Sequence, residues 1–159
     1  MEEVFRGGLF MKLYIRGFAE MQREIERNLT AHTDEIIEHL LKCYLMPEHS
    51  SVNHWKSEIA NQIYKVDRLK NNKKFPSAKQ IYKWTYDKKQ DLITDVRWFT
   101  KYVGMICEEY SIDIDESPAD FMGDFDRICV EYFTWLSNEL SQIGLISKSE
   151  IYSKLNELL

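Results

Sequence analysis

The sequence has 159 residues and a formal net charge of −5, and its 44% hydrophobic and 30% charged residues are typical of a soluble globular domain rather than a disordered chain. Glycine (6) and proline (3) are too scarce for an all-β sandwich, and nothing approaches the roughly 20 consecutive apolar residues of a membrane span. The acidic start MEEV has no apolar signal core, and the three cysteines show no CxxC spacing, so we expect a cytoplasmic protein with reduced thiols.

The first ten residues have an unusual composition. Arg6, Gly7 and Gly8 stand just before Met11, and a ribosome-binding site read in frame would encode such residues. We therefore expect translation to begin at Met11 and residues 1–10 to be loosely ordered.

Apolar residues at steps of three and four predict helices along most of the chain. A first helix is expected over residues 13–28, and after a turn a second helix is capped by Thr33 and ended by Pro47. Ser50 or Ser51 opens a third helix, which runs to NNKK at residues 71–74. The apolar stripes of these helices are Ile15, Phe18, Met21, Ile25 and Leu29; Ile36, Ile37, Leu40, Leu41 and Tyr44; and Val52, Trp55, Ile59, Ile63, Val66 and Leu69.

The second half of the chain continues this pattern. Ser77 is expected to cap a helix after the break, and a helix from Asp91 ends near Tyr110. After a loop, Ser117 and Pro118 start a helix that runs to Gly144, and SKSE at residues 147–150 fits a capping box for a short last helix. We predict one all-α domain over residues 1–159, an antiparallel bundle of about five to seven helices.

Four motifs carry a family resemblance: EIERN at 24–28, HLLKCYLMPEHS at 39–50, HWKSEIANQIYKVDRLKNN at 54–72 and FPSAKQIYKWTYD at 75–87. The segment from Phe18 to Asp87 resembles a bacterial family catalogued as domain of unknown function twenty-nine. In that family an acidic helix, a His-Leu-Leu-Lys run, a Gln-Pro and a helix headed by Trp precede a Pro-Ser pair. The resemblance covers less than half of the chain and implies an all-helical bundle with no assigned activity.

Residues 39–55 hold three of the four histidines and one cysteine. His39 and Cys43 share a helix face, and His49 and His54 would close a zinc site across the following corner. However, the spacing H-x3-C-x5-H-x4-H matches no zinc signature, and the resemblance implies tryptophan at Cys43 and an arginine-rich pattern near His49 in place of ligands. We therefore expect no metal and no other cofactor here, only a corner between two helices.

Arg27 and His32, in RNLTAH, have the arginine–polar–x3–histidine form of a ribonuclease motif found in helical nucleotide-binding domains. There the two residues act together on the RNA phosphate and 2′-hydroxyl, and a histidine suits acid–base work near neutral pH. That family carries the motif late in its bundle, whereas here it lies early. We favour an exposed turn between two helices over a ribonuclease site.

Charge is divided between two poles. Residues 65–89 hold nine basic residues against two acids, interleaved with aromatics, a pattern that can bind single-stranded nucleic acid. Residues 108–126 hold eight acids and no Lys or Arg, without the Gly and Glu that a calcium loop needs. This acidic pole can attract the basic pole within or between chains, or a basic partner. The candidate nucleic-acid contacts are Lys70, Lys73, Lys74, Lys79 and Lys83.

These observations favour a small cytoplasmic helical protein that binds a protein partner, or a copy of itself, without catalysis. A contiguous apolar face formed by Trp98, Tyr102, Tyr132 and Trp135 would support self-association. The alternative is an RNA-directed protein, either a ribonuclease that uses Arg27 and His32 or a nucleic-acid binder that uses residues 65–89.

Overall fold

The computed structural model describes the backbone of residues 2–69, 80, 83, 86–87, 90, 95, 97, 99–142 and 144–159. Within these ranges it describes all side chains except those of residues 2–19, 21–22, 25–26, 69 and 99. The described residues form five α-helices and one short π-helix, with no strand among them. The predicted all-α class is therefore confirmed in this part of the chain.

Helix α1 (Glu2–Leu45) is much longer than the sequence pattern predicts. The expected turn before Thr33 is wrong, because the helix continues through it. Residues 27–32 contain no Gly or Pro to break the helix, and the Thr33 hydroxyl donates a hydrogen bond of 2.7 Å back to the Leu29 carbonyl oxygen instead of capping a new helix. Residues 2–10, expected to be loosely ordered, form the first turns of α1, while the start at Met11 stays a prediction.

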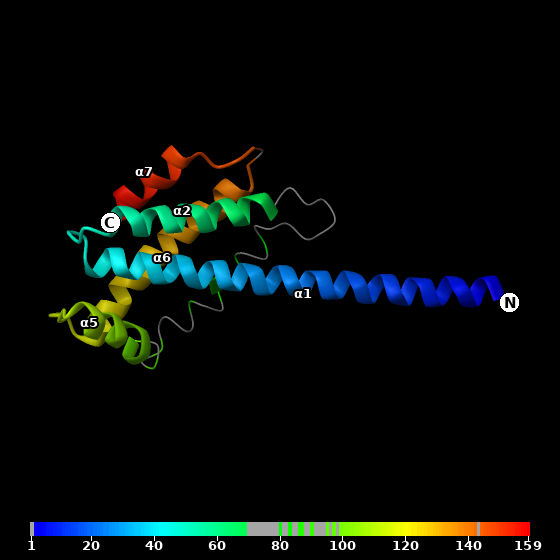
Figure 1. Ribbon diagram of the computed structural model, residues 1–159, viewed down its shortest axis with the longest axis horizontal. Helices are drawn as coiled ribbons and strands as arrows, with labels where there is room; N and C mark the ends of the chain where they lie inside the picture. Colours follow the sequence, from blue (N-terminus) through cyan, green and yellow to red (C-terminus); the bar gives the residue numbers. More distant parts are fainter. Residues whose placement is uncertain are drawn as a thin grey trace.

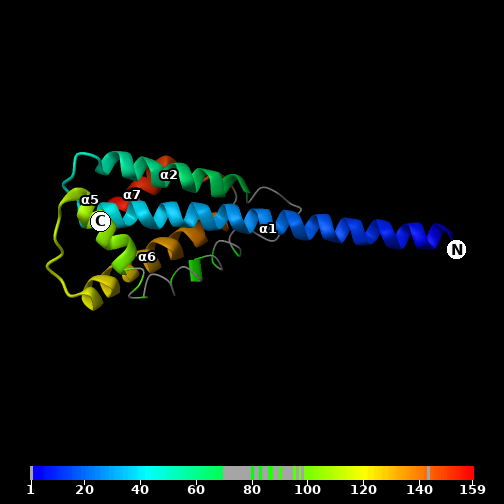
Figure 2. The same ribbon diagram turned by 60° about the horizontal axis from the view of Figure 1, so that its bottom comes forward.

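The predicted stop at Pro47 is confirmed, since α1 ends at Leu45 and α2 (Val52–Leu69) begins directly after Ser51. Helix α2 then runs back beside α1 in both views (Figure 1, Figure 2). The described residues of the predicted stripes are buried, apart from the partly buried Tyr44, and they form much of the core. Their buried members are Leu29, Ile36, Ile37, Leu40 and Leu41 of α1 and Val52, Trp55, Ile59, Ile63 and Val66 of α2.

The π-helix η1 (Phe99–Val103) leads directly into α5 (Gly104–Tyr110). The predicted helix end at Tyr110 is confirmed, because Ser111 takes a left-handed conformation with φ of 54° and closes the last turn. The expected cap at Ser77 and the helix start at Asp91 lie outside the described residues.

Helix α6 (Pro118–Leu140) begins where the sequence predicts. The Ser117 hydroxyl accepts a hydrogen bond of 3.3 Å from the Asp120 N–H, and proline occupies the first helical position. The helix ends at Leu140 rather than at the expected Gly144. It crosses the α1–α2 pair diagonally (Figure 1), so its buried face can pack against α1 while its later part reaches α7.

Helix α7 (Lys148–Leu158) also starts at its predicted cap, where the Ser147 hydroxyl accepts a hydrogen bond of 3.2 Å from the Glu150 N–H. The connection that precedes it is anchored on α2. The buried Asp67 carboxylate accepts a hydrogen bond of 2.8 Å from the Ile146 N–H. This contact ties the chain after α6 to α2 and so fixes where α7 begins.

The N-terminal part of α1 extends past every other labelled helix in both views (Figure 1, Figure 2). We call residues 2–19 the α1 extension. In the part of the chain that the structure describes, no helix combines the length and apolar composition that crossing a membrane requires.

Asp67→Ala should lower the free energy of unfolding by about 1–3 kcal/mol, because the buried Ile146 N–H loses its acceptor. Asp67→Asn keeps an acceptor oxygen and should lose less. Urea denaturation followed by circular dichroism measures both variants. Asp115→Ala, at an exposed loop position, is the control and should change the value by less than about 0.5 kcal/mol. Unchanged stability in Asp67→Ala would contradict the anchoring role.

Candidate functional site

His39 and Cys43 lie one turn apart on α1, in different surroundings. The His39 Nδ1–H donates a hydrogen bond of 2.7 Å to the Glu35 carbonyl oxygen, and the Glu35 carboxylate lies 3.7 Å from the same nitrogen. Cys43 is buried in the core, and this burial raises the pKa of its thiol from 9.0 to about 11. A thiol that keeps its proton is a poor metal ligand, because metals bind the thiolate.

His49 and His54 also lie in different surroundings from each other. The Ser51 N–H donates a hydrogen bond of 3.0 Å to His49 Nδ1, and the His49 ring stacks on Trp55 with centroids 5.0 Å apart. His54 is exposed, with its Nε2 4.0 Å from the Glu58 carboxylate. Among the described residues, no three His, Cys, Asp or Glu side chains gather as a possible metal-ligand set. His49 packs at the corner between α1 and α2, whereas His39 and His54 each contact a glutamate of their own helix.

Arg27 and His32 lie inside α1 and not on the exposed turn that we favoured. Five helical positions place them about 140° apart around the helix axis. Arg27 is exposed, whereas His32 Nδ1 donates a hydrogen bond of 2.6 Å to Oε1 of the buried Gln62 on α2. The imidazole therefore joins two helices, and the two side chains do not share one helix face as a concerted acid–base pair requires.

The other sequence candidates are only partly described. Lys70, Lys73, Lys74 and Lys79 lie outside the described residues, and Lys83 is exposed. Trp98 also lies outside them. Tyr102 is exposed, but Tyr132 is fully buried and Trp135 packs against it with ring centroids 5.6 Å apart. Tyr132 therefore belongs to the core and cannot contribute to an exposed apolar face.

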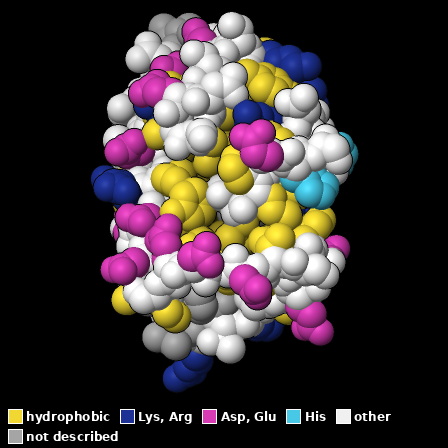
Figure 3. All heavy atoms as spheres, turned by 90° about the vertical axis from the view of Figure 1, so that its left-hand side faces the viewer, with side chains coloured by type: hydrophobic (Ala, Val, Ile, Leu, Met, Phe, Trp, Pro, Cys, Tyr) yellow, Lys and Arg dark blue, Asp and Glu magenta, His cyan; other side chains and the backbone are white. Residues whose placement is uncertain are grey.

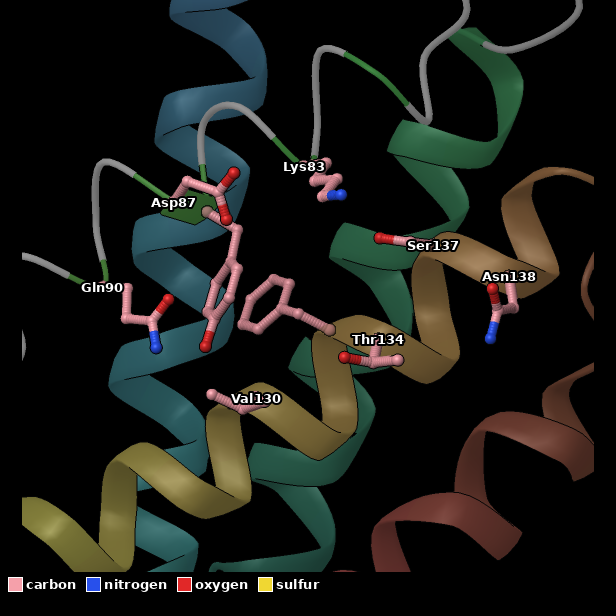
Figure 4. Close-up of a pocket in the computed structure, with 9 residues that line it drawn as sticks. Lys83, Asp87, Gln90, Val130, Thr134, Ser137 and Asn138 are labelled. Atoms are coloured by element: carbon pink, nitrogen blue, oxygen red, sulfur yellow. The ribbon is translucent and has the colours of Figure 1, made fainter.

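A pocket of about 330 Å³ opens between α6 and the described residues of the 83–90 segment (Figure 4). In the close-up, Lys83 points toward Ser137 from across the pocket. Tyr86 stacks on Phe133 with centroids 4.5 Å apart, and burial, followed by the nearby Cys129 and Asp126, raises the pKa of its phenol. The lining residues are Lys83, Tyr86, Asp87, Gln90, Val130, Phe133, Thr134, Ser137 and Asn138.

This pocket suits binding better than catalysis. Its volume lies near the lower limit for small-molecule sites. The Tyr86 phenol keeps its proton at neutral pH, and its hydroxyl has no hydrogen-bond partner among the described residues. A phenol that keeps its proton cannot act as a base.

The end of the molecule opposite the α1 extension combines apolar and acidic side chains. It is formed by residues 44–49, at the turn from α1 into α2, and by residues 110–116, which close and follow α5; we call this surface the end face. Figure 3 shows apolar side chains at its centre and Asp and Glu side chains around much of the margin. The partly buried apolar residues are Tyr44, Leu45, Tyr110, Ile112 and Ile114, and the exposed acids are Glu48, Asp113, Asp115 and Glu116.

Aromatic contacts hold the two segments of the end face together. Tyr110 meets the His49 ring edge-on at 5.5 Å and the Trp55 ring at 5.9 Å. Tyr44 packs on Phe121 of α6 with centroids 5.4 Å apart. The corner, the end of α5 and the start of α6 therefore form one continuous surface.

Acids of α6 lie beside two groups of the end face. Desolvation, a hydrogen bond with the Asp124 carboxyl and the negative charges of Asp124 and Asp120 raise the pKa of Glu116. Burial, followed by the charges of Glu116 and Asp124, raises the pKa of the Tyr44 phenol, against an opposite effect of Arg127. Desolvation is the largest cause of both shifts, and the neighbouring carboxylates add to it.

The sequence pointed to part of this arrangement. The run of acids at 108–126 was visible in the sequence. The Ile-Asp alternation at 112–115 forms no strand. It keeps the two isoleucines against the core while the two aspartates face solvent. The contribution of residues 44–49 and the Gln62 partner of His32 were missed. Both depend on contacts between segments far apart in sequence, for which no local pattern exists.

His32→Ala should lower the free energy of unfolding by about 1–2 kcal/mol, because the buried Gln62 amide loses its partner. Arg27→Ala, at an exposed position of the same helix, should change it by less than about 0.5 kcal/mol. Chemical denaturation measures both variants, and an RNA-cleavage assay runs beside it. RNA cleavage by the wild type that both substitutions abolish would restore the ribonuclease hypothesis.

Cys43 should react with iodoacetamide much more slowly than the half-buried Cys107 in the folded chain, and as fast as Cys107 after unfolding. The raised pKa of Cys43 also makes the stability of the folded chain depend on pH. Between pH 9 and about pH 11 the unfolded chain loses the Cys43 proton while the folded chain keeps it, so this group lowers stability as pH rises through that window. Peptide mass spectrometry follows the labelling; native labelling of Cys43 at the rate of Cys107 would contradict its burial.

Comparisons with known proteins return no match to this chain, whether with family models, curated proteins or solved structures. The resemblance to domain of unknown function twenty-nine stays a prediction.

Proposed function

We propose that this protein acts by binding another protein chain, without catalysis, and that its partner is a second copy of itself. The observation that carries the proposal is the α1 extension, a helical segment that lies beyond all the other described helices (Figure 1). A helix without tertiary contacts is only marginally stable in water, and most helical stability in proteins comes from packing of an apolar face. A partner chain would supply that packing.

The sequence of the α1 extension supports this proposal. Ile15 and Phe18 continue, at helical spacing, the stripe that ends in the buried Leu29. Apolar residues at helical spacing form a face that a partner helix can cover. Continuity with the buried part of α1 favours a partner that extends the same helix packing.

The proposal also covers the domain organisation, the location and the family of the chain. The helices would form a single antiparallel bundle domain over residues 1–159, in the cytoplasm. A bacterial bundle related to domain of unknown function twenty-nine would fit this arrangement, on the motifs of residues 24–87. The aromatic trio of His49, Trp55 and Tyr110 and the shared core support one domain.

Ile15→Glu together with Phe18→Glu should raise the dissociation constant of self-association by about tenfold or more, because two charges would have to be buried at the interface. Sedimentation equilibrium over a range of concentrations measures this constant. The matched control is Asn28→Glu with Ala31→Glu, both exposed on the same helix, which should leave association unchanged.

A wild-type chain that sediments as a monomer at every concentration would contradict self-association. A pull-down from native lysate, with and without nuclease, would then separate a different protein partner from nucleic acid. Nuclease-sensitive capture would favour the RNA-directed alternative and its basic segment at 65–89.

A further inference from the structure

The α1 extension and the end face lie at opposite ends of the molecule (Figure 1). Helix α1 spans the distance between them, since its C-terminal end at Leu45 lies in the end face. A rise of 1.5 Å per residue makes a helix of 44 residues about 66 Å long. One chain therefore cannot bring its own extension onto its own end face, and a contact between the two surfaces requires two copies.

The composition of the α1 extension is basic and apolar. Residues 2–19 contain Arg6, Lys12 and Arg16 against Glu2 and Glu3, a net charge of +1, and ten of the eighteen residues are apolar. Both acids open the segment, and residues 4–19 contain none. Lys12 and Arg16 remain in the chain whether translation begins at Met1 or at Met11. The extension therefore carries positive charge among residues that favour burial.

The end face has the complementary composition. Its two segments, residues 44–49 and 110–116, contain four acids and no Lys or Arg. Five more acids follow in the adjoining turns of α5 and α6: Glu108, Glu109, Asp120, Asp124 and Asp126, the fourth of which pairs with Arg127. The apolar centre includes Leu45, Ile112 and Ile114, each only partly buried, and acidic side chains surround much of it (Figure 3). An apolar centre within a charged rim is the usual anatomy of a protein interface.

We propose that the basic, apolar α1 extension of one copy docks on the acidic end face of the next copy. The apolar residues of the extension cover the exposed centre of the face, and Lys12 and Arg16 lie among the rim acids. Complementary charge of this kind orients the two chains and speeds their encounter. The inference rests on the proposed self-association and names the surface that receives the extension.

Docking of this kind is head-to-tail. Each copy uses one surface to donate the extension and a different surface to receive it. Two antiparallel copies close into a dimer when each docks on the other, and copies that dock in one direction continue into a ring or an open chain. Pairing of two α1 extensions side by side would also stop at a closed dimer.

Charge reversal at each surface tests the inference on the full-length chain. One variant carries Lys12→Glu and Arg16→Glu in the extension, and the other carries Asp113→Lys and Asp115→Lys in the end face. Each variant alone should weaken association by about tenfold or more at low salt, and the wild-type association should weaken as salt rises. Sedimentation velocity follows all samples, with circular dichroism as the check of folding.

An equimolar mixture of the two variants is the decisive sample. The reversed extension of one variant is complementary to the reversed face of the other, and their unchanged surfaces also match. The mixture should therefore recover association that neither variant shows alone. Glu131→Lys with Glu139→Lys, two acids on α6 outside the end face, is the matched control and should associate as the wild type does.

The outcomes separate this inference from the function on which it rests. Self-association that persists in the end-face variant, or a mixture that stays as weak as its components, would overturn the docking surface and leave self-association standing. A monomeric wild type would overturn both. A synthetic peptide of residues 4–19, added to the wild-type chain, should compete with its association, and a peptide with the same residues in scrambled order should not. Equal competition by the scrambled peptide would assign the face to basic segments in general, and would overturn docking of this chain's own extension.

Discussion

The packing of α2 against the second half of α1 is the constraint on which the rest of the structure depends. The apolar stripes of the two helices, which include Leu29 of α1 and Val66 of α2, bury each other. Further side-chain contacts join the helices toward each end of the pair. The His32–Gln62 hydrogen bond joins the helices near one end, and the stacking of His49 on Trp55 fixes the corner at the other. Helix α6 then packs across this pair, and Asp67 holds the segment that leads into α7.

The same pairing explains why α1 is longer than the fold requires. Because α2 ends at Leu69, it accompanies only the later part of α1 (Figure 1). The earlier residues continue the helix beyond the end of α2, and their sequence keeps apolar residues at helical spacing. Packing of an apolar helix face is the usual source of helical stability, and the proposed contact with another chain would supply it.

Local signals in the sequence predicted the helix starts and stops at Pro47, Ser117 and Ser147, because capping depends on residues within one turn. The same signals misplaced a turn at Thr33, where a side chain able to cap instead bonds back along a continuous helix. The candidate sites were harder to predict. The pocket joins Tyr86 to Phe133, and the end face joins Tyr44 to Glu116; both depend on tertiary contacts between distant segments.

The acids of the end face are only partly explained by the fold. Asp120 lies in the first turn of α6, where the helix dipole favours a negative charge, and Asp124 forms an ion pair of 3.1 Å with Arg127. Glu48, Asp113 and Asp115 lie outside any helix. Neither the dipole nor an ion pair among the described residues compensates these three acids. Desolvation is the largest cause of the raised pKa of Glu116, and Asp124 and Asp120 add to it. Like charges gathered on one surface disfavour the isolated chain, and the proposed contact with the α1 extension would place cations beside them.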